Sequence, residues 1–442
     1  MKNQSLVERA RGKGHREKRM VKTWYSLYDK MLIRENLVKA FKKVKSAKGA
    51  GGVDGQSIND FAKSVDANID QLLTELSGKT YRPQPVRRKE ITKPTGGVRL
   101  LGIPTVRDRV VQQALLNLLQ PIFDPEFHPS SYGYRPGRSS HNAITKATMF
   151  IREYERKWVV DMDLSKCFDT LNHDLIINSF RKRIKDGSIL TLLEQMLKSG
   201  VMTDEGWQSS EIGSPQGGVI SPLVANVYLD DFDQEMMQRG HRIIRYADDI
   251  LILCQSKKSA VNALHQATKY LEEDLHLTVN QTKTHICHSF KGVNFLGVSI
   301  HSSFTKIQKA KIKSFKAKVK AITRRNSPVN LDKVIADLNP ILRGFANYFR
   351  IANCKSEFKK LSSWLRRRLR AKQLKLWKKP KKLHRRLRQL GYTGEFKAIK
   401  MNSWKNAASP LSHYSLPNEY LHCEKGLFNL ETVETGISVS FI

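Results

Sequence analysis

The sequence predicts an α+β fold for the first part of the chain and an all-helical, basic domain after it. Stretches with helical spacing separate apolar, strand-like runs at 158–164, 243–247, 250–254 and 293–300. After about Ser303 the strand-like runs stop, and helical sequence rich in Lys and Arg continues to about Leu390. Strands mixed with helices in the first part indicate a mostly antiparallel sheet. The change in composition indicates a second domain.

The composition points to a globular protein with a polyanionic partner. The 442 residues are 40% hydrophobic, which excludes a largely disordered chain, and 77 Lys+Arg against 41 Asp+Glu give a net charge of +36. Nucleic acid is the expected partner, with anionic lipid as the alternative. We expect no membrane partner and a cytoplasmic location, because no apolar run reaches about 20 residues. The five cysteines form no CxxC pair and predict neither disulfides nor a zinc knuckle.

The helices are predicted from composition and spacing. A helix over 35–44 leads into 48–55, whose four glycines cannot continue it and therefore form a loop. Further helices are predicted at 108–119, 175–180, 189–197 and 259–275.

A basic hairpin is predicted near residue 95. Residues 91–92 and 98–100 alternate like strands around a turn that contains two glycines. Lys93 and Arg99 flank its tip, where two cations suit a clamp that closes on phosphates. Two solvated cations on a surface hairpin are the alternative.

Two pairs of acids suggest a metal site. Asp248 and Asp249 stand between two apolar runs and predict a hairpin with both carboxylates at its tip, although a solvated Asp-Asp turn is the alternative. Asp161 and Asp163 share one face of another predicted strand. Carboxylates among apolar residues need a compensating charge, and Mg²⁺ suits a site of Asp oxygens. Two ions would give the two-metal arrangement of phosphoryl transfer. The residues alone do not decide between Asp161 and Asp163.

These acids belong to segments that resemble reverse transcriptases. Tyr246-Ala247-Asp248-Asp249 resembles the family signature, and residues 163–169, Asp-Leu-Ser-Lys-Cys-Phe-Asp, resemble its partner motif. Other segments are similar, in the family's order, to motifs of group II intron-encoded reverse transcriptases: 131–139, 213–218, 280–284 and 295–297. Residues 339–349 resemble the maturase segment of that family. The resemblance covers roughly 35–404.

The resemblance implies a right-hand polymerase, with fingers, palm and helical thumb, and assigns residues to roles. It selects Asp163 over Asp161, because Phe168 stands five positions after Asp163, where the family's ring lies under the deoxyribose and excludes a 2′-hydroxyl. The implied catalytic residues are Asp163, Asp248 and Asp249, which with Leu164 would hold two Mg²⁺ ions. The implied substrate-binding residues are Lys93 and Arg99 for the triphosphate, with Leu164, Phe168, Gln216 and Lys283. The implied primer grip is Phe295, Leu296 and Gly297.

The basic region is predicted to contact nucleic acid. Between 355 and 390 the only acid is Glu357, and apolar residues interleave with the cations, so that one stripe can pack while another follows phosphates. A merely soluble charged helix would carry acids at i±4, and these are missing. The candidate contact residues are Arg343, Arg366, Arg367, Arg370, Lys378, Lys379, Lys382 and Arg385. The resemblance implies that this thumb holds the template and primer and binds group II intron RNA.

Four regions are predicted along the chain: 1–85 as an N-terminal extension with the first part of the fingers, 86–303 as fingers and palm, 304–400 as thumb or maturase domain, and 401–442 as a tail. The tail offers only His413, His422 and Cys423 as soft ligands, so we expect no metal-bound endonuclease domain.

Three functions are weighed. The first is an intron-encoded reverse transcriptase that copies an RNA template from a DNA or RNA primer with dNTPs and assists splicing and retrohoming. The second is a relative recruited by its host for DNA repair or defence. The third is a non-enzymatic RNA-binding splicing factor, which is disfavoured because all three catalytic acids are present.

Overall fold

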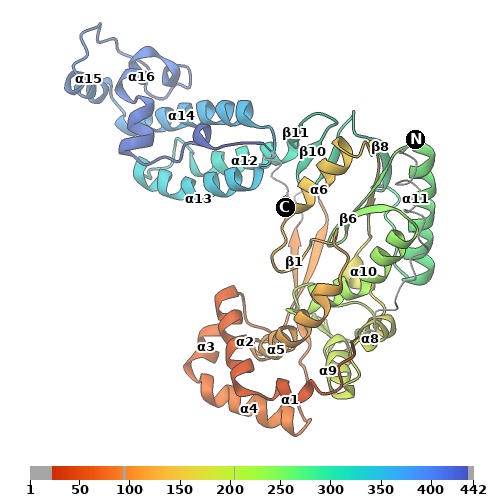
Figure 1. Cartoon of the computed structure of the whole chain (residues 1–442). Helices are drawn as coiled ribbons and strands as arrows, with labels where there is room; N and C mark the ends of the chain where they lie inside the picture. Colours follow the sequence, from red (N-terminus) through yellow and green to blue (C-terminus); the bar gives the residue numbers. More distant parts are fainter. Residues whose placement is uncertain (1–21, 93–95, 204, 437–442) are drawn as a thin grey trace, which may run out of the picture. The chain divides into compact units, whose positions relative to one another are not determined.

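The computed structural model describes residues 22–92, 96–203 and 205–436 (Figure 1). The chain forms two compact units, and each is assembled from separate stretches of sequence. The first unit takes the chain up to Pro129, Leu164–Gln238 and Ala267–Asn280. The second takes Ser130–Asp163, Arg239–Gln266 and the chain from Gln281 onward. The two units are each made of separate stretches, whereas the four predicted regions are continuous in sequence. The four regions therefore remain a prediction.

The first unit is mainly helical. Its helices are α1 (Tyr28–Met31), α2 (Arg34–Ala47), α3 (Ile58–Lys63), α4 (Val65–Ser77), α5 (Val106–Phe123), a 3-10 turn (Asp124–Glu126), α7 (Cys167–Thr170), α8 (His173–Arg181), α9 (Gly187–Leu197) and α10 (Ser221–Gln238). Its strands are β1 (Val86–Thr92), β2 (Val98–Ile103), β4 (Val201–Thr203) and β5 (Gly206–Gln208), in the sheet order β2-β1-β4-β5. β1 and β2 pair antiparallel, which confirms the predicted hairpin, while its tip at 93–95 lies outside the described residues.

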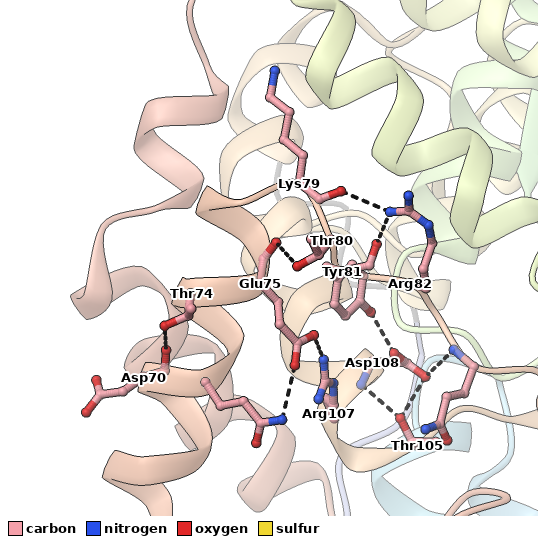
Figure 2. A network of polar contacts seen from close by, with 12 residues as sticks. Asp70, Thr74, Glu75, Lys79, Thr80, Tyr81, Arg82, Thr105, Arg107 and Asp108 are labelled. Atoms are coloured by element: carbon pink, nitrogen blue, oxygen red, sulfur yellow. Dashed lines mark hydrogen bonds and ion pairs between the residues drawn. The ribbon is translucent and has the colours of Figure 1, made fainter.

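A buried acid joins the segment before β1 to the start of α5 (Figure 2). The Asp108 carboxylate accepts hydrogen bonds from the Tyr81 hydroxyl at 2.6 Å, the Thr105 hydroxyl at 2.7 Å and the Gln84 backbone N–H at 3.2 Å. The Thr105 hydroxyl in turn accepts from the Asp108 N–H and caps the helix. Burial raises the pKa of Asp108 despite these bonds. This residue therefore fixes where β1 begins.

The second unit contains the two other sheets and the C-terminal helices. Its strands are β3 (Trp158–Asp163), β6 (Arg242–Tyr246), β7 (Asp249–Cys254), β8 (His285–His288), β9 (Val293–Phe295), β10 (Val298–Ile300) and β11 (Thr305–Ile307). Its helices are α6 (Ser140–Arg152), α11 (Lys257–Lys269), which starts in this unit, α12 (Lys309–Ile322), α13 (Leu331–Phe349), α14 (Lys355–Trp377), α15 (Pro380–Gln389) and α16 (Pro410–Ser415). Short turns cover Tyr270–Asp274, Asn406–Ala408, Tyr420–Glu424 and Leu430–Thr432. The sheet orders are β6-β7-β3-β8 and β11-β10-β9, and all their pairs are antiparallel.

Two predicted elements differ from those observed. The single strand expected over 293–300 is two strands, β9 and β10, because Leu296 (φ 47°) and Gly297 (φ 84°) form a two-residue turn between Phe295 and Val298. Positive φ at both central positions is the geometry that turns a chain back on itself, and an apolar leucine gives no sign of it. The helix expected over 259–275 is α-helical only to Lys269 and continues as a π-helical turn, Tyr270–Asp274.

One apolar core connects the β6-β7-β3-β8 sheet to the helices of the second unit. Its buried residues come from β3, β6 and β7 of this sheet and from α6, β9 to β11 and α12 to α14, and include Phe295, Phe315, Leu338 and Phe358. Leu421, Leu427 and Leu430 from the C-terminal segment belong to the same core. A smaller core holds α15, α16 and the end of α14 together. None of the described helices has the length and apolar character needed to cross a membrane.

Candidate active site

Asp248 and Asp249 lie at the turn between β6 and β7, as the sequence predicts. Tyr246 pairs with Asp249, so Ala247 and Asp248 form the two-residue turn, and Ala247 takes a left-handed conformation (φ 58°). A side chain on Gly133 is excluded, because a β-carbon there would lie 2.3 Å from the Ala247 nitrogen. The 131–139 segment therefore packs its backbone against the turn that carries Asp248.

Strand β3 supplies the third predicted acid. Asp163 is the register partner of Asp249, so the two acids stand opposite each other in neighbouring antiparallel strands. Asp161 lies two positions earlier on the same face and pairs with Leu251 and His285. The structure thus places Asp163 beside the Asp248-Asp249 turn and keeps Asp161 one step further along the strand.

Negative charge is concentrated at these strands. Desolvation and the charges of Asp248, Asp163 and Asp161 together raise the pKa of Asp249 to about 6, although Lys283 opposes them. Asp249 keeps contact with solvent, so its carboxyl is only partly desolvated. Burial and the charge of Asp163 also raise the pKa of Asp161 to about 6, while His285 opposes them. A cation bound here would relieve this repulsion.

Lys283 provides part of the compensating charge. Its ammonium donates to the Asp163 carboxylate at 2.9 Å, and the Thr284 hydroxyl accepts from the Asp163 N–H at 3.3 Å. The 280–284 segment therefore places its lysine against Asp163, one of the three predicted acids.

The candidate ligands for a metal ion are the carboxylates of these strands. Within 22–92, 96–203 and 205–436, no three His, Cys, Asp or Glu side chains converge as a ready-made metal cage. Catalytic Mg²⁺ ions usually keep waters and substrate phosphates among their ligands, so an open carboxylate set is compatible with them. The donor set of Asp163, Asp248 and Asp249 consists only of hard oxygen atoms and carries unbalanced negative charge. These residues fit Mg²⁺ on both counts.

In the first unit, the structure joins Arg99 to Gln216. The Arg99 guanidinium donates to the Gln216 side-chain oxygen at 2.8 Å, and the Gly102 N–H donates to the Gln216 backbone oxygen at 2.8 Å. A β-carbon on Gly217 would lie 2.4 Å from the Gly102 oxygen, which explains the small residue there. The β1–β2 hairpin and the 213–218 motif are therefore in direct contact. Lys93 lies outside the described residues.

Phe168 is attached to the same motif. Its ring is buried, and its backbone oxygen accepts from the Ser214 N–H at 2.7 Å. Leu164 is also buried, and it forms an isolated antiparallel bridge with Val279. Of the predicted substrate-binding residues, Arg99 contacts Gln216 within the first unit, where Phe168 contacts Ser214 of the same motif. Lys283 is in the second unit.

The predicted primer grip is the tip of the β9–β10 hairpin. Phe295 is buried in the core, while Leu296 and Gly297 make the turn. A β-carbon on Gly297 would lie 3.4 Å from the Phe349 ring and 3.3 Å from Lys311. The tip is therefore packed directly against α12 and α13.

The predicted nucleic-acid contacts divide into two groups. Arg370 is 3% exposed and donates to the Leu416 oxygen and to Asn418, both at 2.8 Å. Arg366 forms an ion pair with Glu431 at 2.7 Å. Both guanidiniums hold the C-terminal segment against α14, which sequence spacing could not reveal because their partners are 46 to 65 residues away. The others are exposed: Arg343, Arg367, Lys378, Lys379, Lys382 and Arg385.

The sequence analysis overlooked the lysines of α12. This helix carries six lysines and no acid, and five of them are exposed: Lys309, Lys311, Lys313, Lys318 and Lys320. The missing acids at i±4 are the same signal that singled out residues 355–390. It also overlooked Tyr348, for which the sequence gives no signal beyond its place in the maturase-like segment.

Comparisons with known proteins identify the family of the chain. Residues 91–300 match the family described as Reverse transcriptase (RNA-dependent DNA polymerase), and residues 312–391 match the group II intron maturase-specific domain. Protein YkfC of Escherichia coli (strain K12) is 35% identical over 302 residues, which cover 60% of this chain and 79% of that protein. The group II intron-encoded protein LtrA of Lactococcus lactis subsp. cremoris is 28% identical over 342 residues, covering 62% of this chain.

The chain spans 56% of the length of LtrA, and less of several other relatives. Among solved structures, apo telomerase from Candida tropicalis aligns with 51% of this chain and 55% of its own, at 16% identity and a TM-score of 0.39, which is too low to support an argument. The family rests instead on the two domain matches, on YkfC and on the motifs that the fold assembles. The chain belongs to the group II intron-encoded reverse transcriptases, a family of RNA-dependent DNA polymerases.

Proposed function

We propose that this protein extends a primer 3′ end with dNTPs on an RNA template by two-metal phosphoryl transfer. The observation that carries the proposal is the register of β3 and β7, which sets Asp163 opposite Asp249 beside the Asp248 turn. Acids in this arrangement repel one another unless cations are bound, as the raised pKa of Asp249 indicates.

Asp163, Asp248 and Asp249 would hold two Mg²⁺ ions, and Leu164 has only its main-chain oxygen to offer them. When bound, the ions would neutralise charge on the attacking 3′-oxygen and on the leaving pyrophosphate. Lys283 donates to Asp163, so its ammonium stands where the substrate phosphates would approach the acids. It would add positive charge to the transition state.

The nucleotide would be held by residues of the first unit. Arg99 offers a guanidinium to the triphosphate, and its bond to Gln216 orients both side chains. Lys93 would act with Arg99 from the other side of the hairpin tip. The Phe168 ring would lie under the sugar and leave no room for a 2′-hydroxyl. Its bonded backbone holds it next to the 213–218 motif.

The template–primer duplex would lie on α12. Lys309, Lys313, Lys316 and Lys320 follow the spacing i, i+4, i+7 and i+11, so they form one row along the helix. A second row contains Lys311 and Lys318, and exposed small residues separate the rows: Ala310, Ser314, Ala317 and Ala321. Small side chains let a helix approach a shallow groove, while the two rows reach the phosphates on either side.

We further propose that the maturase-specific region, 312–391, binds group II intron RNA and assists splicing and retrohoming. The domain match and the relationship to LtrA support this partner, and the exposed cations Lys378, Lys379, Lys382 and Arg385 offer the charge. The predicted division into regions and the location in the bacterial cytoplasm or nucleoid belong to the same proposal.

Primer extension tests the proposed chemistry. The duplex is poly(rA)/oligo(dT) with dTTP and Mg²⁺, and the proteins are the wild type, Asp248→Ala and the control Asp66→Ala. Asp66 is an exposed acid of α4, and its surface ion pair with Arg34 is worth at most about 1 kcal/mol. We expect extension by the wild type and the control, and a loss of at least about a hundredfold in Asp248→Ala, because one metal ligand is gone.

Two results would contradict the proposal. If Asp248→Ala extends the primer as well as the wild type, the metal site is misplaced. If the wild type binds the duplex tightly but makes no DNA with Mg²⁺ or Mn²⁺, the protein is an RNA-binding splicing factor.

A further inference from the structure

The tip of the β9–β10 hairpin is held from outside by two elements of the helical region. Three successive backbone oxygens of the hairpin accept hydrogen bonds there. The Tyr348 hydroxyl of α13 donates to the Leu296 oxygen at 2.9 Å. Gln308, the residue before α12, donates its backbone N–H to the Gly297 oxygen and its side-chain amide to the Val298 oxygen, both at 3.1 Å. The primer-grip tip is thus bound to α12 and α13.

Tyr348 also contacts the start of α6. Its backbone oxygen lies 2.7 Å from the His141 Nε2, and the two rings are 5.8 Å apart between centroids. Burial raises the pKa of the Tyr348 hydroxyl, and the charges of Tyr246 and Asp249 raise it further. Tyr348 therefore links the β9–β10 tip to α6, and α6 packs against β6 and β7, the strands of the Asp248–Asp249 hairpin.

The hydrogen bond to the Leu296 oxygen stabilises a turn whose backbone conformation is unfavourable for leucine. A leucine in the left-handed conformation is disfavoured, and only glycine takes it routinely. Gly297 supplies the second position of the turn at no such cost. Removal of the Tyr348 hydroxyl would leave the Leu296 oxygen without this donor and free the turn to shift. The sheet pairing of β9 with β10 would remain, because it does not involve Tyr348.

We propose that Tyr348 is a positioning residue that holds the primer-grip tip in place relative to the catalytic hairpin. The proposal rests on the proposed polymerase function and adds to it a residue that none of the motifs assigns. Tyr348 lies within the region that matches the maturase-specific domain, so that region supplies part of the polymerase site. The hydroxyl acts through the Leu296 oxygen and does not touch the reacting atoms.

The test compares Tyr348→Phe with Tyr414→Phe. Tyr414 is a matched control, since it is also a helical, partly exposed tyrosine of the second unit whose hydroxyl donates to a leucine backbone oxygen, that of Leu390, at 3.2 Å. Five quantities are measured in the full chain: the Tm, the Kd for a template–primer duplex, the kcat and the dNTP KM of extension, and the fluorescence of a primer with 2-aminopurine at its 3′ end.

We expect Tyr348→Phe to lower kcat about three- to tenfold, the effect of losing one neutral hydrogen bond. The 2-aminopurine signal should change, because the primer terminus is less fixed, while Tm, duplex Kd and dNTP KM stay as in the wild type. Tyr414→Phe should match the wild type in every quantity.

Three outcomes would overturn the proposal. The first is a wild-type kcat and a wild-type 2-aminopurine signal in Tyr348→Phe. The second is a loss of kcat in Tyr414→Phe as large as that in Tyr348→Phe. The third is a loss of kcat in Tyr348→Phe that comes with a lowered Tm. A wild type that binds the duplex without extending it would contradict the proposed function alone, since the 2-aminopurine comparison would still decide the role of Tyr348.

Discussion

At the scale of single residues, the acids of the site differ in what their surroundings do to them. Asp249 and Asp161 have pKa values raised to about 6 by desolvation and neighbouring carboxylates. Asp163 forms an ion pair with Lys283, and its backbone N–H donates to the Thr284 hydroxyl. Charge concentrated in this way opposes folding and favours cation binding, as is common where function conflicts with stability. The register of β3 and β7, rather than any one residue, brings these negative charges together.

Phe168 provides the residue-scale prediction. Phe168→Val removes the ring proposed to lie under the deoxyribose, so a nucleotide with a 2′-hydroxyl should fit. We expect the preference for dTTP over UTP, measured as the ratio of kcat/KM values on a poly(rA) template, to fall by about tenfold or more. Incorporation of dTTP by the same variant is the internal control for folding. An unchanged ratio would remove Phe168 from sugar selection.

At the scale of elements, Asp108 links the segment before β1 to α5 (Figure 2). Its pKa is raised, so the folded protein keeps a proton that the unfolded chain releases near the ordinary value of 3.8. Stability contributed by Asp108 is therefore present at low pH and lost as pH rises through its folded pKa.

The corresponding prediction concerns Asp108→Asn. Relative to this variant, the wild type should lose free energy of unfolding as pH rises above about 4, with a limiting slope of about 1.4 kcal/mol per pH unit. Urea unfolding at several pH values measures it, and Asp70→Asn, an exposed acid of α4, is the surface control. A stability difference between wild type and Asp108→Asn that is constant with pH, or that grows in favour of the wild type, would contradict the sign.

The lysine rows of α12 yield the second element-scale prediction. Lys313→Ala/Lys320→Ala removes two cations from one row, and Lys257→Ala/Lys258→Ala removes two exposed cations from α11 as the control. The slope of log Kd for template–primer against log salt should fall by about 1.5 to 2 in the first variant, because fewer counterions are released. Equal slopes in both double variants would mean that α12 does not follow the phosphates.

At the scale of the whole molecule, a net charge of +36 makes binding to nucleic acid a general property of the chain. The cations are not equivalent, however. Arg366 and Arg370 hold the C-terminal segment to α14, and Lys372 is fully buried with its ammonium donating to the Arg324 and Ser327 oxygens. Leu421, Leu427 and Leu430 of the segment after α16 belong to the same apolar core as the β6-β7-β3-β8 sheet. Charge attracts the partner, and the exposed subset decides where it binds.

The sequence alone determined the α+β class and the family resemblance, because strand periodicity and motif spacing are local properties. Through that resemblance it also selected Asp163, Asp248 and Asp249 as the candidate acids. The β1–β2 hairpin, the β6–β7 hairpin and most helices follow from the same signals. Only the tertiary structure set Asp163 opposite Asp249, joined Arg99 to Gln216, separated buried from exposed arginines and brought Tyr348 to Leu296. The cited contacts join residues 52 to 117 positions apart, and they depend on packing and register, which local patterns do not encode.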